Sequence, residues 1–475
     1  MARSDFYRTT SQFKNASEDI KKALDLDPDN VQLQKRAIPL FLASGQHDLI
    51  QKGKDLLEQA LESNAEDVHF QLLKARSVLV EGTAPAIENA RQILQKITED
   101  QPQITDAWVL LGEIAIKQGQ PGKAMEAALG GLTYGPNNKS LLLLKASAEA
   151  DKSPVLAIPT LKLLHELEPS DLGIVVLMAN TYIKTSEPQK AVSLLREQLA
   201  ICDVSARRKC NTALAVALYK SGNKAEAQKE FDSLLESEPD DPEPLLAQVQ
   251  LLKEDKNWIK LNEKVVNWYS NHPEDSRTLT KIARDLMLLE DSQARKTAED
   301  ILRIILKNDS EHAEAVSVLA ILLQIGGRDA ESATLYQRLL ELEPNNIIAI
   351  NNLAWIVCEV QGKHQQALEL AQRGLKIAPR YYDLIDTRGV IYYRLGEFDK
   401  AVLDFNECIK FYPGVTSASI GTRFYLARAL AKLGQKGKAI QYLKEALEMN
   451  SQTGGLSTAD LSEAQRLLNQ LKEGS

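Results

Sequence analysis

Proline recurs along this chain at a nearly constant interval. Neighbouring members of the series lie 33 to 35 residues apart, or about twice that where one is skipped. A fixed period of this size is typical of stacked repeats, each too small to bury its own apolar face. The 475 residues are therefore expected to form one elongated array instead of several globular domains. The series comprises Pro102, Pro136, Pro169, Pro239, Pro273, Pro344, Pro379 and Pro413.

The clearest unit spans Tyr382–Val415 and shows what its small residues contribute. Gly389 lets two helices approach closely, and Gly396 allows a left-handed cap at the end of the first helix. Ala401 fits where the second helix crosses the first. Proline cannot continue a helix, so Pro413 fixes the exit from the unit. The pattern predicts two helices joined by a short turn.

These residues match the signature of tetratricopeptide repeats, and nearly the whole chain resembles that family. The resemblance implies an all-α fold, a right-handed α-solenoid (superhelix) of about thirteen helix-turn-helix repeats over residues 1–453. Residues 454–475 begin with two glycines and continue as an amphipathic segment, which predicts a C-terminal capping helix. Other units with the signature are Thr105–Asn138, Arg208–Asp241, Ala313–Asn346 and Ile347–Tyr381.

Several units depart from the regular length. Val31–Asp67, Val68–Ile104 and Ser276–His312 are about three residues longer, and we expect the extra length near the turn between the two helices. The spacing slips at residues 201–207, where the curvature of the array is expected to change. Counting back from the first complete unit places Met1 inside a repeat, so the sequence is expected to be a piece of a longer protein.

Composition and motifs argue against most other classes of protein. The net charge of −8 disfavours a general nucleic-acid binder, and no apolar run is long enough for a membrane span. The four cysteines form no metal-binding pair and are expected to be reduced, although Cys202 and Cys210 lie close enough in sequence to bridge in an oxidising compartment. The six histidines have no metal-ligand spacing, and no phosphate-binding or nucleophile motif occurs. We therefore expect neither an enzyme nor a cofactor or metal.

The resemblance places function in a concave groove, because tetratricopeptide arrays line that groove with the first helix of each repeat. The family's carboxylate clamp, with Lys and Asn four residues apart, is not found at the matching positions. Arginine and aromatic residues, the usual hot-spot types, are concentrated near the C-terminus, which favours an acidic or C-terminal peptide as the ligand. The first-helix residues expected to contact it are Asn351, Trp355, Asp386, Tyr393, Arg394, Phe424 and Arg428.

The leading hypothesis is a non-catalytic protein–protein interaction scaffold. One alternative is the repeat region of a larger bacterial envelope assembly for exopolysaccharide or protein export, suggested by the segment Asn351–Trp355. Another is the targeting module of an enzyme whose catalytic domain lies outside this chain. We expect a soluble protein of the bacterial cytoplasm or periplasm, envelope-associated if the chain belongs to an export protein. The sequence leaves the partner, the compartment and the oligomeric state open.

Overall fold

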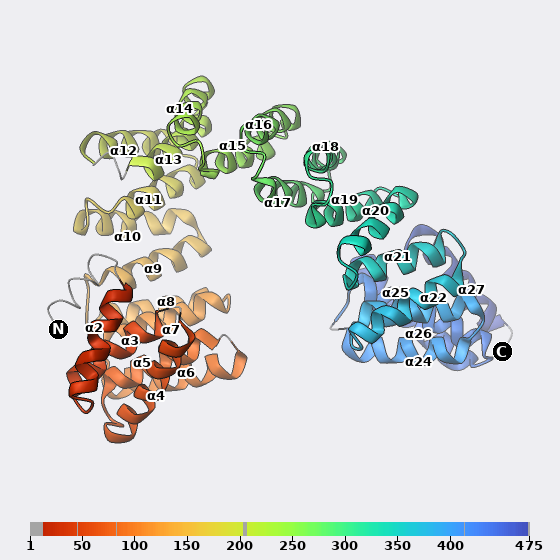
Figure 1. Cartoon of the computed structure of the whole chain (residues 1–475), viewed down its shortest axis with the longest axis horizontal. Helices are drawn as coiled ribbons and strands as arrows, with labels where there is room; N and C mark the ends of the chain where they lie inside the picture. The colour runs from red at the N-terminus through yellow and green to blue at the C-terminus, as the bar shows by residue number, and fades with distance from the viewer. Residues whose placement is uncertain (1–12, 45, 82, 203–206, 413, 474–475) are drawn as a thin grey trace. The chain divides into compact units, whose positions relative to one another are not determined.

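The structure, a computed structural model, describes residues 13–44, 46–81, 83–202, 207–412 and 414–473. Within these ranges it contains helices and no strands, and successive helices stack as hairpins (Figure 1). Two compact units divide the chain, Met1–Ala247 and Gln248–Ser475. Each unit is thus an all-α stack of helical pairs, as the sequence predicts.

The first unit is built from pairs in which a first helix packs on the second helix that follows it. Several first helices also contact the first helix of the next pair, as α7 does with α9 and α11 does with α13. The helices are α2 (Phe13–Leu26), α3 (Val31–Leu42), α4 (His47–Ser63), α5 (Val68–Glu81), α6 (Ala84–Asp100), α7 (Thr105–Lys117), α8 (Pro121–Leu132), α9 (Lys139–Lys152), α10 (Pro154–Leu167), α11 (Leu172–Lys184), α12 (Pro188–Ile201), α13 (Arg207–Lys220) and α14 (Lys224–Ser237), with α15 (Glu243–Glu254) crossing the boundary.

The second unit repeats this arrangement, with first helices in contact from α17 to α19 and from α21 through α23 to α25. Its last helix, α27, is the predicted capping helix, and it packs on α26. The helices are α16 (Trp258–Asn271), α17 (Ser276–Met287), α18 (Ser292–Asn308), α19 (Ala313–Ile325), α20 (Asp329–Leu342), α21 (Ile347–Glu359), α22 (His364–Ile377), α23 (Tyr382–Leu395), α24 (Phe398–Phe411), α25 (Ser417–Lys432), α26 (Lys436–Thr453) and α27 (Thr458–Glu473).

The turns inside the repeats use a left-handed residue where the sequence predicts one. Gly396 has φ 80°, and its N–H donates to the carbonyl groups of Tyr392 and Tyr393 at the end of α23. The repeat at residues 242–275 has Lys256 in place of this glycine. Lys256 adopts the same left-handed region, with φ 52°. The geometry of the turn is therefore kept even where the glycine is lost, at a cost in backbone strain.

The three long repeats lengthen their second helices. The helices α4, α6 and α18 each have 17 residues, whereas α14, α20 and α24 have 14. Counted from the C-terminal end, buried residues occupy matching positions, as Leu302 and Ile305 of α18 match Tyr336 and Leu339 of α20. The additional turn, about 4.5 Å long, is therefore at the N-terminal end, next to the inter-helix turn as predicted.

Small residues allow the hairpins to pack closely. Ala401 is fully buried, and a Cβ built on Gly389 would lie only 2.6 Å from the ring of Phe405. The predicted irregularity at 201–207 and the predicted helix stop at Pro413 involve residues 203–206 and 413, which lie outside the described residues. The same holds for the first half of the N-terminal repeat, residues 1–12.

Candidate functional site

Three consecutive first helices, α21, α23 and α25, carry all seven residues that the sequence predicts to contact a ligand. Side-chain caps start two of these helices. Asn346 caps α21 by accepting a hydrogen bond from the N–H of Ala349 at 3.0 Å. Thr416 and Ser419 form a capping box at the start of α25. Because α23 packs between the other two, side chains of equivalent position meet across the helix pairs.

Asn351 and Asp386 accept hydrogen bonds from threonines on the neighbouring first helix. The Thr387 hydroxyl donates to Asn351 Oδ1 at 2.9 Å, and the Thr422 hydroxyl donates to Asp386 Oδ1 at 2.6 Å. Each pair is 36 residues apart in sequence. Burial raises the pKa of the Asp386 carboxyl to about 7, with a smaller contribution from the nearby acids Asp383 and Asp404. These contacts join neighbouring repeats, and they use one side-chain oxygen each of Asn351 and Asp386.

Arg394 is already paired with a carboxylate of the chain. Its guanidinium donates to both oxygens of Glu359, at 2.7 and 2.5 Å, across 35 residues. Burial by itself would raise the pKa of Glu359, but the hydrogen bonds and charge of Arg394 outweigh it and keep that pKa below its usual value. An acidic ligand would therefore have to displace Glu359 to reach Arg394.

Arg428 is enclosed by aromatic rings and by the capping helix. Its guanidinium carbon lies 4.7 Å from the ring centre of Tyr393 and 5.1 Å from that of Tyr425, within the range of a cation–π interaction. Glu463 of α27 approaches the guanidinium at 3.0 Å, and the side chain is only 10% exposed. Arg428 and Tyr393 thus form part of the packing between the last repeat and its cap.

Phe424 requires a correction. The sequence predicts that its side chain lies on the ligand face, but it is fully buried in a cluster with Ile420, Leu443 and Leu468. The reason is the capping helix α27, which covers the side of α25 that would otherwise face outward. Phe424 is therefore a core residue of the C-terminal end and is not open to a ligand.

Trp355 differs from the other six, because it is exposed and has no polar partner. Its side chain is 38% exposed, and its indole N–H has no hydrogen-bond acceptor among the described residues. Ile348 lies seven residues earlier on the same face of α21 and is 45% exposed. Glu359, paired with Arg394, follows one turn later. We call Ile348, Asn351, Trp355, Glu359 and Arg394 the Trp355 face.

Sequence reasoning missed Ile348, Glu359 and the two threonines of this region. Glu359 and Arg394 are 35 residues apart, which is about one repeat. Asn351 and its partner Thr387 are 36 residues apart. Equivalent positions of neighbouring first helices meet, so opposite charges or polar groups spaced by one repeat predict such contacts.

The thiols of this region are not arranged for nucleophilic chemistry. Cys358 Sγ lies 3.6 Å from His364 Nδ1, but the thiol is buried. Burial, together with the charge of Glu359, raises the pKa of Cys358 to about 12, so the thiol is protonated at neutral pH. All four cysteines are free, including Cys202 and Cys210. Among the described residues no group of three His, Cys, Asp or Glu side chains is placed to hold a metal.

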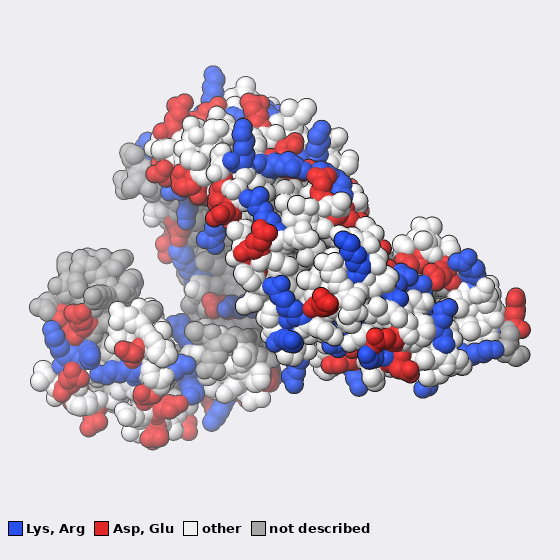
Figure 2. Space-filling model, turned by 45° about the vertical axis from the view of Figure 1, so that its right-hand side comes forward, with Lys and Arg blue, Asp and Glu red and all other residues white. Residues whose placement is uncertain are grey.

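The surface charge is mixed. On the face shown in Figure 2, basic and acidic side chains are interspersed, without a large area of one sign. Ion pairs between neighbouring repeats contribute to this pattern, such as Arg196 with Glu226 at 2.5 Å and Arg284 with Glu314 at 2.5 Å. None of the described helices combines the length and the apolar character needed to cross a bilayer.

A stack of helical hairpins with small residues at the crossings and left-handed residues in the turns defines a helical repeat protein. The family model described as "Tetratricopeptide repeat" matches residues 1–30, 383–414 and 423–453. The chain thus contains tetratricopeptide repeats in these three segments. Arrays of this family are protein-interaction scaffolds, and the all-α solenoid found here has that architecture.

Solved structures with similar folds cover different shares of the chain. A crystal structure of MamA is 22% identical, covers 36% of this chain and 92% of its own, and has a TM-score of 0.30. The Cut9–Hcn1 structure from the APC/C is 15% identical, covers 99% of this chain and 89% of its own, and has a TM-score of 0.40. PilW, a type IV pilus biogenesis factor, is 19% identical, covers 42% of this chain and 91% of its own, and has a TM-score of 0.34. No curated protein matches the sequence.

Proposed function

We propose that this chain is a non-catalytic scaffold that binds an extended segment of a partner protein on the Trp355 face. The observation that supports this most is the exposure of Trp355 on a first helix, with the exposed Ile348 on the same face. Large aromatic side chains contribute strongly to binding when a partner covers them. The ion pair of Glu359 with Arg394 would then form a polar rim beside this apolar centre.

The chemistry of the partner follows from what is already paired. Arg394 and Arg428 each hold a carboxylate of this chain, so they offer little to an acidic peptide unless Glu359 or Glu463 moves away. We therefore propose a segment with an aliphatic or aromatic anchor residue, in place of the acidic segment expected from sequence. The described residues contain no feature that favours either the export assembly or the enzyme-targeting module.

Peptide display against the purified chain tests this proposal. Selected peptides should carry an apolar anchor, and Trp355→Ala should weaken their binding by about 30-fold, the effect of losing roughly 2 kcal/mol at a hot spot. Trp258→Ala is the matched control, because Trp258 is a partly exposed tryptophan at the start of a second helix. Equal binding by the wild type and Trp355→Ala would refute the assignment of this face.

A further inference from the structure

A cavity of about 680 Å³ lies beside the extended end of α18, separate from the Trp355 face. Its size is within the range of small-ligand pockets in proteins. It is lined by the N-terminal part of α18, the helix that the long repeat Ser276–His312 extends by a turn, and by the C-terminal end of α19. Similar cavities lie beside the other two long second helices, next to Lys54 of α4 and Arg91 of α6.

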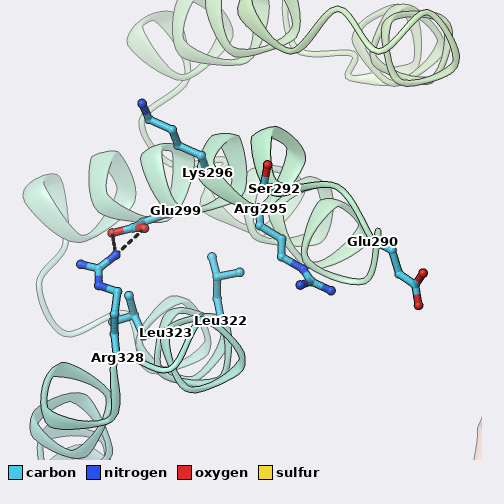
Figure 3. Close-up of a pocket in the computed structure, with 9 residues that line it drawn as sticks. Glu290, Ser292, Arg295, Lys296, Glu299, Leu322, Leu323 and Arg328 are labelled. Atoms are coloured by element: carbon cyan, nitrogen blue, oxygen red, sulfur yellow. Dashed lines mark hydrogen bonds and ion pairs between the residues drawn. The ribbon is translucent and has the colours of Figure 1, made fainter. Parts of the chain in front are cut away.

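Some of the charged side chains that line the α18 cavity are paired with an opposite charge, and others are not. Arg328 is held by Glu299 at 2.8 Å and by Glu331 at 2.7 Å, so its charge is balanced. Figure 3 shows this pair at one end of the cavity, with Arg295 in the space between α18 and α19 and Lys296 extending away from it. Arg295 is therefore the cation directed into the cavity that has no carboxylate among the described residues.

One hydrogen bond holds the Arg295 side chain against the end of α17. Its Nε donates to the carbonyl oxygen of Met287 at 3.3 Å, one of the free carbonyl groups at the end of α17. This bond leaves the two terminal nitrogens of the guanidinium without a partner among the described residues. Leu322 of α19 lies beside it, and Leu323 lies nearer Arg328, so both contribute an apolar part of the lining (Figure 3).

We propose that this cavity binds a monocarboxylate that carries an aliphatic group. The terminal nitrogens of Arg295 would hold the carboxylate in a two-pronged hydrogen bond, and the aliphatic group would pack on Leu322 and Leu323. Arg328 is already balanced by Glu299, so Arg295 offers one unpaired positive charge, which suits a single negative charge better than a phosphate dianion. The same chemistry occurs at a peptide C-terminus ending in leucine and in a free aliphatic acid.

Ligand-observed NMR titrations of the whole chain test the proposal. The probes are the tripeptide Ala-Ala-Leu, its C-terminal amide, N-acetyl-leucine and inorganic phosphate. The free acids should bind at least about tenfold more tightly than the amide, because only they accept the charged hydrogen bonds of Arg295. Binding of N-acetyl-leucine without the tripeptide would identify a free acid as the ligand, and binding of both would show that a peptide end fits.

Variants locate the binding. Arg295→Gln should weaken carboxylate binding about tenfold, whereas Arg277→Gln, which removes an exposed charge from the same repeat outside the cavity, should bind like the wild type. Equal affinity for acid and amide, equal binding by Arg295→Gln, or tighter binding of phosphate would overturn the proposal. The acid–amide comparison uses the wild type, so it decides the question even if Arg295→Gln fails to fold.

This site does not depend on the proposed function of the Trp355 face. Trp355→Ala should leave the carboxylate titration unchanged, and Arg295→Gln should leave the binding of displayed peptides unchanged. Failure of one proposal can therefore be told apart from failure of the other.

Discussion

Gly389 and Gly421 both lie inside first helices, but their surroundings differ. A Cβ on Gly389 would meet the ring of Phe405 at 2.6 Å, whereas nothing lies within 4 Å of a Cβ on Gly421. We expect Gly389→Ala to lower the free energy of unfolding by about 1–3 kcal/mol through overpacking. Gly421→Ala, the control, should raise it by about 0.5–1 kcal/mol, because alanine favours the helix. Thermal unfolding followed by circular dichroism measures both, and stabilisation by both substitutions would contradict the packing described here.

Asp386 should make the stability of the second unit depend on pH. Its pKa is raised from 3.8 to about 7 by burial, so the folded chain binds a proton that the unfolded chain releases. The stability linked to this proton is fully present below pH 4 and is lost as the pH rises through 7. The free energy of unfolding falls by about 4 kcal/mol over this range.

The variant Asp386→Asn keeps an oxygen that accepts the hydrogen bond of Thr422 but cannot ionise. We expect it to be more stable than the wild type at pH 8 and to show a weaker dependence on pH between 4 and 8. Denaturant unfolding at several pH values gives the comparison. Parallel pH profiles for the two proteins would mean that Asp386 does not carry this effect.

At the scale of helices, the ends of most elements could be predicted because they are set locally. Gly396 and Lys256 occupy left-handed turns, and the extra turns of the long repeats are visible in the spacing alone. The roles of Arg428 and Phe424 could not be predicted in the same way. Their burial depends on where α27 packs, which is a tertiary contact that the sequence of α25 does not encode.

The capping helix α27 can be tested by one substitution. Leu468 packs on the cluster of Phe424 and Leu443, so Leu468→Ala should lower the free energy of unfolding by about 2–3 kcal/mol. Arg466→Ala, an exposed position on the same helix, should change it by less than about 0.5 kcal/mol. Thermal unfolding of the two variants gives the comparison.

A chain that is truncated before residue 457 should bind a hydrophobic dye and self-associate, because the apolar face of α25 and α26 becomes exposed. A truncated chain that stays monomeric and binds no dye would show that α27 is dispensable.

For the whole molecule, the repeat architecture predicts that stability is the sum of contacts between neighbouring hairpins. A fragment of residues 242–475, which starts at Pro242 before α15, keeps all contacts within the second unit. We expect this fragment to fold alone with the helical content per residue of the full chain, and to melt within about 10 °C of it because the contacts within the second unit are kept. Circular dichroism melting curves of the fragment and the full chain provide the measurement. A fragment without a cooperative transition would show that the second unit depends on the first, and the chain would then have to be treated as a single cooperative array.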